Sequence, residues 1–419
     1  MSKENTRAGV VIVGAGQAGG DAATSLRQQG YQGAITLIGE EPLLPYRRPP
    51  LSKAFLLGEM SEEELQLKPA ETYQQFNIGY RLDTRVEAID RNDKTVQLTD
   101  GSTLSYEHLV LATGGQARRL CIPGSQHSNV HYIRSVEDIR RLRQDMQPGR
   151  RLAIVGGGYV GLEVAAVACK AGLRVSVVEA MPRVLARVTA PELSAFYQQA
   201  HRRRGVEILI GCGVQAFLGD TRVEQVELSD GRCLDVDLVI VGIGLIPSVE
   251  LAQQCGLEIV EGGIAVDART RTVDPSIFAI GDCTYHENLF YEGRRMRLES
   301  VPNASEQARV AAANICGKDS VYNSLPWFWS DQFNLKLQMV GLSQGYDRLV
   351  IRGSLEDESF IAFYLADGVV ISADAVNRPQ DFMFAKKLVA QRSPVSAEHL
   401  SDCDIPLKSL IVQSPQLHE

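Results

Sequence analysis

Two glycine-rich turns, 142 residues apart, constrain this chain more than any other feature of its sequence. The first reads GAGQAG at 14–19 and the second reads GGGYVG at 156–161. Each lies between an apolar run and an alanine-rich segment, which is the strand–turn–helix context of a dinucleotide fingerprint. Glycines there let the backbone turn tightly and approach a pyrophosphate, which then lies at a helix N-terminus. Two such turns predict two dinucleotides in one molecule, a flavin and a nicotinamide.

An acidic residue follows the first turn at a distance typical of ribose recognition. Glu40 lies 21 residues after Gly19, just beyond the predicted strand 35–38. A carboxylate at this place accepts hydrogen bonds from an adenosine ribose. The alternative is an exposed strand end, and the adjacent Glu41 is a second candidate. With the glycine turn in place, we favour the ribose role for Glu40.

Glu179 follows the second turn in the same way, 18 residues after Gly161. A carboxylate here binds the ribose hydroxyls of NADH and repels the extra phosphate of NADPH. Arg183 and Arg187 are close in sequence, and an arginine can accept a phosphate. We nevertheless expect NADH to be the nicotinamide cofactor.

The chain of 419 residues is too long for one core. The runs 109–115 and 238–244 are apolar and end in glycines, as is typical of strands buried on both faces of a parallel sheet. We interpret them as points where the chain passes between two Rossmann-like α/β domains. The expected domains are an FAD-binding domain (1–112 and 245–324), an NADH-binding domain (113–244) and a C-terminal α+β domain (325–419).

The C-terminal region has a different pattern, with alternating apolar and polar residues that predict an antiparallel sheet. Asp367-Gly368 is a hairpin signal, and a helix is predicted over 379–391. The predicted strands are 335–342, 348–352, 360–365 and 369–375.

A further flavin signal is the apolar run 276–280, which ends in Gly281-Asp282. A carboxylate at such a strand end can bind a ribityl hydroxyl, although Gly-Asp alone is a common turn. A helix is predicted over 303–316 with Asn303 as its N-cap. Its positive end would stabilise charge on a reduced flavin, and an ordinary capped helix is the alternative.

Composition excludes several classes of protein. The net charge of −8 argues against a nucleic-acid-binding protein. No apolar run approaches the length of a membrane span, and residues 1–9 lack the apolar region of a signal peptide, so we expect a cytoplasmic protein that binds no membrane. The alternative is a mature form from which an organellar targeting segment has been cleaved. The eight cysteines form no C-x-x-C or zinc pattern, and most are expected to be small core residues. His127 and His131 fall in a predicted loop, so we expect no metal site.

Five motifs occur in an order that makes the chain resemble a known family. They are RPPLSK at 48–53, ATG at 112–114, GGGYVGLE at 156–163, GD at 281–282 and ESVPNA at 299–304. Together they resemble the FAD-dependent NADH:ferredoxin reductases of bacterial oxygenase systems, over nearly the whole chain. The resemblance implies a glutathione-reductase-type fold with FAD, NADH and C-terminal domains.

By this resemblance Arg48 and Lys53 lie along the flavin, with Lys53 near its reactive edge. Glu163 would face and pair with Lys53, and Tyr159 would cover the flavin until the nicotinamide displaces it. Lys53, Glu163 and Tyr159 are thus the expected catalytic residues, because hydride transfer depends on positioning rather than on an acid or base. A solvated lysine at a helix start is the alternative for Lys53.

The motifs also define two expected cofactor sites. For FAD the expected residues are Gly14, Ala15, Gly16, Ala18, Gly19, Glu40, Arg48, Lys53, Ala112, Thr113, Gly114, Asp282, Val301, Pro302 and Ala304. For NADH they are Gly156, Gly158, Tyr159, Val160, Gly161, Glu163, Glu179 and Gly244.

Without a dithiol, electrons cannot leave as they do in disulfide reductases. Oxygen, a quinone or a one-electron protein carrier remain, and we favour the carrier. A cationic face would steer an acidic ferredoxin, with Trp329 as an aromatic anchor. For each residue of this face taken alone, the alternative is at least as well supported: a solvated cation for each lysine or arginine, and a core residue for Trp329. The expected interface residues are Arg309, Trp329, Lys336, Lys386, Lys387 and Lys408.

The expected function is that of an NADH:ferredoxin reductase, passing electrons through FAD to a 2Fe–2S ferredoxin that serves a haem-thiolate monooxygenase. The alternatives are a rubredoxin reductase, an NADH oxidase, and an NADH-sensing flavoprotein like apoptosis-inducing factor. Oxidases typically need a redox cysteine beside the flavin, and no cysteine is clearly placed for it. The sensing protein usually carries a long insertion in its third domain, and none is visible.

Overall fold

The computed structural model describes residues 9–392 and 394–411, and the chain divides into two compact units. Unit 1 holds the chain up to Pro50, Gly58–Gln116 and Leu245–Ser324, and unit 2 holds the remainder. These boundaries lie close to the predicted domain limits, whose outer ends fall outside the described residues. Two features were not predicted: the segment Leu51–Leu57 belongs to unit 2, and the C-terminal region shares that unit with the predicted NADH domain.

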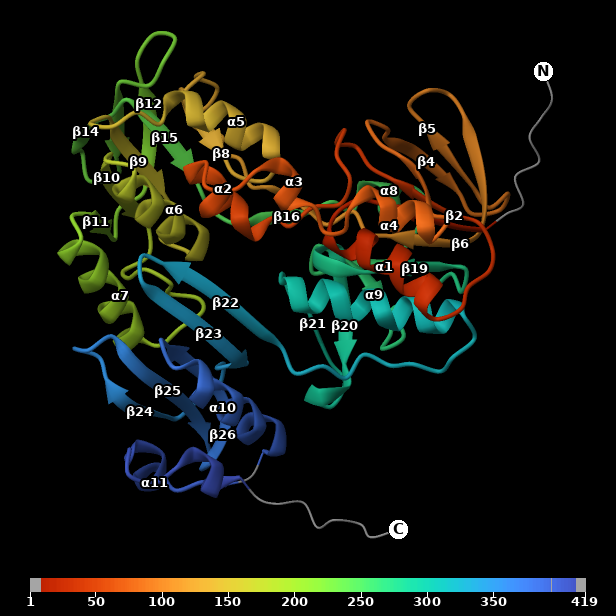
Figure 1. Ribbon diagram of the computed structural model, residues 1–419. Coiled ribbons are helices and arrows are strands. Elements are labelled where there is room, and N and C mark those ends of the chain that lie inside the picture. The colour runs from red at the N-terminus through yellow and green to blue at the C-terminus, as the bar shows by residue number, and fades with distance from the viewer. Residues whose placement is uncertain (1–8, 393, 412–419) are drawn as a thin grey trace. The chain divides into compact units, whose positions relative to one another are not determined.

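The main sheet of unit 1 has the strand order β3-β2-β1-β6-β5-β4, with β19 also paired to β6 (Figure 1). Alternate residues of β1 enter separate cores, Val10 and Ile12 on one face and Val11 and Val13 on the other. Burial on both faces explains why this strand is apolar throughout. The strands are β1 (Gly9–Val13), β2 (Ile35–Ile38), β3 (Gly79–Arg81), β4 (Val86–Asp90), β5 (Thr95–Leu98), β6 (Thr103–Leu111) and β19 (Ile277–Ala279).

Helices α1 (Gln17–Gln28) and α9 (Val301–Ile315) pack against each other and contribute alanines to the core that contains Val10 (Figure 1). A smaller sheet of order β17-β18-β20-β21 completes the unit. The other elements are α3 (Glu62–Leu65), α4 (Ala70–Gln75), α8 (Glu250–Gln254), β16 (Leu245–Pro247), β17 (Ile259–Val260), β18 (Gly263–Val266), β20 (Thr284–Asn288) and β21 (Arg294–Met296).

Helix α9 begins earlier than predicted, so Asn303 is not its N-cap. Ser300 takes that position, and its side chain accepts a hydrogen bond from the backbone N–H of Asn303 at 3.3 Å. Pro302 fits in the first turn because its missing N–H would have no partner within the helix. The amide of Asn303 instead donates to the carbonyl of Leu298 at 2.9 Å.

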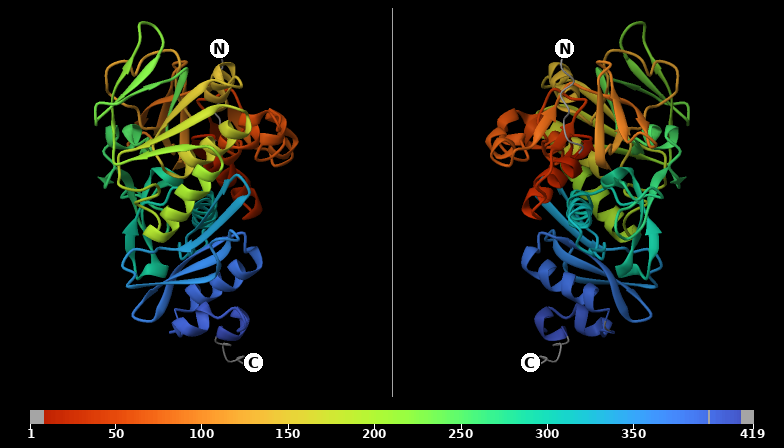
Figure 2. Two further views of the ribbon diagram at one scale, coloured as in Figure 1. Left: turned by 90° about the vertical axis from the view of Figure 1, so that its left-hand side faces the viewer. Right: turned by 90° about the vertical axis from the view of Figure 1, so that its right-hand side faces the viewer.

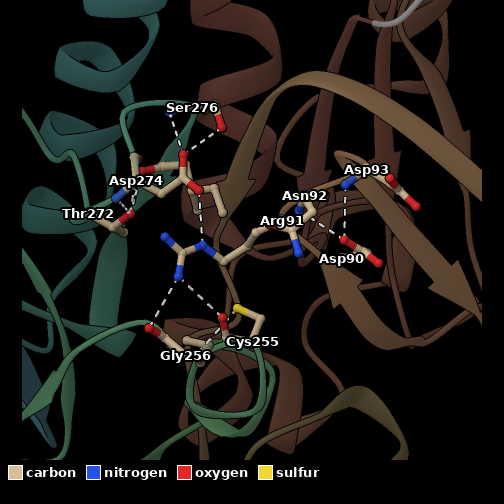
Figure 3. A network of polar contacts seen from close by, with 11 residues as sticks. Asp90, Arg91, Asn92, Asp93, Cys255, Gly256, Thr272, Asp274 and Ser276 are labelled. Carbon is tan, nitrogen blue, oxygen red and sulfur yellow. Dashed lines mark hydrogen bonds and ion pairs between the residues drawn. The ribbon is translucent and has the colours of Figure 1, made fainter.

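A polar network around Arg91 joins distant segments of unit 1 (Figure 3). Its guanidinium donates to Asp274 at 3.0 Å and to the carbonyls of Cys255 and Gly256 at 3.4 and 3.3 Å. Burial opposes ionisation of Asp274, but hydrogen bonds from Ser276 and Arg91 outweigh it and hold its pKa below the ordinary value. Arg91 therefore ties the β4–β5 hairpin to two segments more than 150 residues later in the chain.

Unit 2 contains a parallel sheet of order β11-β10-β9-β15-β8 and a three-stranded antiparallel sheet. The parallel strands are β8 (Val130–Tyr132), β9 (Arg151–Val155), β10 (Arg174–Glu179), β11 (Glu207–Ile210) and β15 (Leu238–Val241). The antiparallel strands are β12 (Val214–Leu218), β13 (Gln225–Leu228) and β14 (Cys233–Asp235). Strand β7 (Gly115–Ala117) begins in unit 1, and its last residue is the first of the stretch Ala117–Gly244 of unit 2. The helices are α2 (Ala54–Leu57), α5 (Val136–Asp145), α6 (Tyr159–Lys170) and α7 (Pro191–Arg203).

The C-terminal part of unit 2 is the predicted antiparallel sheet, of order β22-β23-β26-β25-β24, with α10 packed on it (Figure 2). The predicted helix 379–391 is confirmed as α10. Asp367 and Gly368 have φ of +50° and +76°, which is the geometry of a tight hairpin. The elements are β22 (Trp327–Gln332), β23 (Leu335–Gly341), β24 (Arg348–Ser354), β25 (Ser359–Ala366), β26 (Val369–Val376), α10 (Pro379–Gln391) and α11 (Ala397–Ser401).

All eight cysteines are free, but the prediction that most are core residues is wrong. Only Cys212 and Cys283 are buried, whereas Cys121, Cys233 and Cys403 are exposed. Within 9–392 and 394–411, no helix combines the length and apolar character needed to span a bilayer.

Candidate active site

In the first glycine turn, close packing leaves no room for a side chain at two of the glycines, whereas the third has open space beside it. A Cβ on Gly14, whose φ is +113°, would lie 2.2 Å from the carbonyl oxygen of Ala112. A Cβ on Gly19 would lie 1.9 Å from the carbonyl oxygen of Gly14. A Cβ on Gly16 would meet no atom within 4 Å, and Gly16 is the N-cap of α1. The open glycine therefore exposes the positive end of a twelve-residue helix.

The second turn repeats this construction in unit 2. A Cβ on Gly156 (φ +110°) would lie 2.3 Å from the oxygen of Gly242, and one on Gly161 would lie 2.1 Å from that of Gly156. A Cβ on Gly158, the N-cap of α6, would again meet no atom within 4 Å. Both turns thus leave open space beside a helix N-terminus, which is where a pyrophosphate binds. The residues present fit one dinucleotide in each unit.

Glu179 ends β10 and is held at the second turn. One carboxylate oxygen accepts a hydrogen bond from the N–H of Gly157 at 2.7 Å, and the other accepts one from the N–H of Met181 at 2.7 Å. The carboxylate is therefore fixed in orientation beside the exposed helix end. The geometry is compatible with a contact between Glu179 and a ribose, which stays a prediction.

The two candidate acids of the first unit differ in their partners. The side chain of Glu40 is 66 % exposed and lies 3.7 Å from Arg85. Glu41 accepts hydrogen bonds from Arg48 and from the hydroxyl of Tyr46, both at 2.6 Å. Burial disfavours the charged form of Arg48, but Tyr46, Glu41 and also Asp282 raise its pKa above the ordinary value. Glu41 therefore positions Arg48, and Glu40 is the acid left exposed to solvent.

Asp282 lies in a 3₁₀ turn, Gly281–Cys283, that follows β19. The N–H of Gly281 donates to Oε1 of Gln307 on α9 at 2.6 Å, and Gly281 has φ of +81°. This bond joins the turn to α9, whose first turn contains the predicted FAD residues Val301, Pro302 and Ala304. Strand β6 ends immediately before Ala112, and the hydroxyl of Thr113 donates to the carbonyl of Ser248 at 2.6 Å.

Lys53 and Glu163 form the predicted pair within unit 2. The ammonium of Lys53 lies 2.7 Å from Oε2 of Glu163, whose side chain is only 4 % exposed. The hydroxyls of Ser52 and Ser330 donate to the two carboxylate oxygens, each at 2.6 Å. A buried charge that is paired and hydrogen-bonded on both oxygens is well stabilised. Sequence reasoning missed both serines, although Ser52 lies within the motif RPPLSK.

Tyr159 is the first residue of α6 and packs onto the C-terminal sheet. Its hydroxyl lies 2.8 Å from the sulfur of Met339 on β23, and its ring centroid is 5.1 Å from that of Phe328 on β22. Burial raises the pKa of Tyr159 well above its ordinary value, so the phenol is neutral. Its predicted role over a flavin remains a prediction.

The predicted partner residues fall into two groups. Trp329 lies against Trp327, with ring centroids 5.5 Å apart, and the ammonium of Lys386 lies 5.4 Å from the Trp327 ring centre. Lys336, Lys387 and Lys408 are exposed elsewhere in this part of unit 2. Arg309 lies in unit 1 and pairs with Glu306 on α9.

Comparison with known proteins agrees with this architecture. Residues 8–308 match the family model described as pyridine nucleotide-disulphide oxidoreductase, and residues 327–411 match the model described as reductase C-terminal. Putidaredoxin reductase CamA of Pseudomonas putida is 45 % identical over 97 % of both chains.

Two solved structures are similar over nearly their whole length. A covalent putidaredoxin reductase–putidaredoxin complex has a TM-score of 0.93 at 45 % identity, covering 97 % of this chain and 99 % of that one. The ferredoxin reductase for the CYP199A2 system from Rhodopseudomonas palustris has a TM-score of 0.93 at 42 % identity, covering 96 % and 99 %. With two dinucleotide sites, a family match over most of its length and these relatives, the chain belongs to the pyridine nucleotide-disulphide oxidoreductase family and is an oxidoreductase that uses FAD and NAD(H).

Proposed function

We propose that this protein is an NADH:ferredoxin reductase, which oxidises NADH, releases a proton and passes one electron to each of two molecules of a 2Fe–2S ferredoxin that serves a haem-thiolate monooxygenase. The observation that carries the proposal is the pair of identically built open glycine turns, one in each unit. The chemistry that bound FAD would supply is hydride acceptance from NADH and release of electrons one at a time. We place the reaction in the cytoplasm, as the sequence predicts.

In this proposal the residues of each turn have separate roles. The N–H groups around Gly16 and Gly158 bind the two pyrophosphates, and Glu40 and Glu179 bind the adenosine riboses. The charge of Glu179 excludes the 2′-phosphate of NADPH. The remaining expected residues of both cofactor sites keep their predicted roles, and Lys53, Glu163 and Tyr159 serve hydride transfer.

The route by which electrons leave follows from the cysteines and from the relatives. The described cysteines are all free and none belongs to a C-x-x-C pair, so a dithiol outlet is not supported. One similar solved protein is a ferredoxin reductase and another was captured in a covalent complex with putidaredoxin. Both support a protein carrier as the acceptor of electrons.

The proposal is tested by anaerobic stopped-flow reduction of the yellow protein with NADH, together with cytochrome c reduction with and without a 2Fe–2S ferredoxin. Fast bleaching and a large ferredoxin-dependent gain are expected, and rubredoxin serves as the second carrier. Slow bleaching with a persistent long-wavelength band and no gain would instead favour an NADH-sensing flavoprotein. Rapid oxygen consumption without any carrier would favour an NADH oxidase.

The carrier surface is tested separately by charge reversal. Lys336→Glu and Lys387→Glu should each raise the KM for ferredoxin at low salt, because exposed cations steer an acidic partner. Added salt should reduce the difference from the wild type. Lys94→Glu, an equal change at an exposed position in unit 1, is the control. Unchanged ferredoxin reduction in both variants at low salt would remove this surface from the proposal.

A further inference from the structure

A chain of buried polar side chains continues from the Lys53–Glu163 pair into the interior of unit 2. Ser330 on β22 contacts Glu163 at 2.6 Å, and the amide nitrogen of Gln332 lies 3.3 Å from the Ser330 hydroxyl. Oε1 of Gln332 lies 2.9 Å from Nε2 of His201 on α7. Ser330, Gln332 and His201 have no exposed surface. Three elements distant in sequence therefore meet in one hydrogen-bonded line.

The direction of every hydrogen bond in this line is fixed by chemistry. The Glu163 carboxylate is paired with Lys53 and can only accept hydrogen bonds, so Ser330 donates its single hydroxyl proton to it. The Ser330 oxygen must then accept from the amide of Gln332, which leaves Oε1 of Gln332 facing His201. A flipped Gln332 amide would place two oxygens together without a proton between them. His201 must therefore donate from Nε2.

The properties of His201 agree with this assignment. Burial lowers its pKa to about 4, although the bond to Gln332 opposes the shift. The imidazole is thus neutral at physiological pH, with its proton on Nε2. Nδ1 finds no hydrogen-bond partner among the described residues, and the ring packs edge-on against Phe333 at 5.0 Å between centroids. His201 is therefore the outer end of the line, and all three donors point toward Glu163.

We propose that Ser330, Gln332 and His201 are positioning residues for the Lys53–Glu163 pair, holding the Glu163 carboxylate in one orientation and stabilising its negative charge. Aligned donors in a dry interior polarise one another, so their effect on the end carboxylate adds along the line. This inference rests on the proposed function only for the role of the Lys53–Glu163 pair in hydride transfer. The C-terminal sheet thereby takes part in the chemistry of the nucleotide-binding half of unit 2.

A purely structural role would give a different result. The same contacts would also join β22 to α6 and α7, and their loss would then lower stability alone. The readout must therefore report on the Glu163 carboxylate. Its infrared stretching bands respond to the number and strength of hydrogen bonds, and comparison with Glu163→Gln assigns them.

The experiment measures these bands in the holoprotein for three variants and one control. Ser330→Ala removes the donor next to Glu163, His201→Leu removes the far donor, and His201→Gln restores an N–H group at that end. Ser372→Ala is the control, because Ser372 is equally buried in the same sheet and donates only to the carbonyl of Val340. If Ser330→Ala does not fold, Ser330→Cys replaces it with a weak donor of similar size.

We expect Ser330→Ala to shift the Glu163 bands most, and His201→Leu to shift them less in the same direction. His201→Gln should return them toward the wild type, and Ser372→Ala should leave them unchanged. Loss of a hydrogen bond to a charged group predicts a fall of about ten- to one-hundredfold in the rate of flavin reduction by NADH in Ser330→Ala. The KM for NADH should change little, since the line does not include the predicted ribose or pyrophosphate contacts.

Bands that stay unchanged in Ser330→Ala and in His201→Leu would overturn the inference, whatever the stability of these variants. Because the infrared measurement needs neither NADH nor a carrier, this failure is distinct from failure of the proposed function. Shifted bands with no ferredoxin-dependent electron transfer would reject the proposed function and keep the positioning role.

Discussion

The phenol of Tyr364 donates a hydrogen bond of 2.7 Å to the carboxylate of Asp374, and both side chains are buried in the C-terminal sheet. The hydroxyl of Thr189 lies 3.0 Å from the same oxygen, Oδ2. Burial raises the pKa of Asp374 to about 6, even though both hydroxyls lower it. Oδ1 has no hydrogen-bond partner among the described residues. Asp374 therefore holds a proton in the folded protein at a pH where an exposed aspartate has lost it.

Replacing Asp374 with Asn should change how stability depends on pH. The folded-state pKa lies above the ordinary 3.8, so the stability that the proton supplies is complete below about pH 4 and is lost as the pH rises through 6. Over this window the wild type should lose roughly 3 kcal/mol relative to Asp374→Asn. Thermal midpoints of both proteins between pH 4 and 7.5 measure the effect, and parallel curves would contradict it.

Gly158→Ala should weaken NADH binding without unfolding the protein. A methyl group at Gly158 meets no protein atom within 4 Å, so it would occupy only the space that we assign to the pyrophosphate. We expect the KM for NADH to rise at least about tenfold, the equivalent of one hydrogen bond to a charged group, with an unchanged melting temperature. Gly156→Ala is the matched comparison, because its positive φ and its approach to Gly242 predict a loss of stability. Equal melting temperatures for the two variants would refute this division of roles.

Glu179→Gln should reduce the preference for NADH over NADPH. The amide keeps the size and one acceptor oxygen of the side chain but removes the charge that repels a 2′-phosphate. The ratio of kcat/KM for the two nucleotides should fall by about ten- to one-hundredfold, mostly through KM. Glu207→Gln, an exposed change on the neighbouring strand β11, should leave the ratio unaltered. A proportional change with both nucleotides would exclude Glu179 as the discriminating residue.

His286→Phe should make unit 1 less sensitive to acid. Burial lowers the pKa of His286 to about 4, so its contribution to stability is present above the ordinary pKa of 6.5 and is lost as the pH falls toward 4. The wild type should lose roughly 3 kcal/mol over this range relative to the variant. His399→Gln, at an exposed histidine, is the control for acid denaturation measured by intrinsic fluorescence. An equal acid midpoint in His286→Phe and the wild type would show that His286 titrates normally.

The parts of the site that could be predicted are those fixed by local backbone geometry. Gly14 and Gly156 need a positive φ, and Gly19 and Gly161 lie against the carbonyl of the first glycine of the same turn. Only glycine fits at these positions, so the pattern can be read from the sequence. The hairpin at Asp367-Gly368 was predictable for the same reason. The start of α9 was placed wrongly because Ser300 and Asn303 are both good capping residues, and Pro302 at the second helical position decides between them.

The hydrogen-bonded line behind Glu163 could not be predicted, because no local rule joins His201 to Gln332. Their contact depends on how α7 packs beside β22, which neither segment encodes alone. The sequence shows Ser330 and Gln332 as polar residues at alternate positions, a pattern that usually indicates a solvated strand face, whereas both side chains are buried in β22. The placement of residues 51–57 in unit 2 could not be predicted either, because their side chains contact residues that lie far along the chain, such as Glu163.

The division of each unit into three separate stretches of chain has a consequence for biosynthesis. Unit 1 needs β19 and α9, so it cannot be completed until residue 324 has left the ribosome. Unit 2 in turn waits for β22, which supplies Ser330 to a glutamate synthesised 167 residues earlier. Nascent strands such as β1 and β9 must therefore remain unaggregated until their late partners emerge. Neither unit corresponds to a continuous fragment, so an expression strategy based on truncation at a single linker would yield neither of them whole.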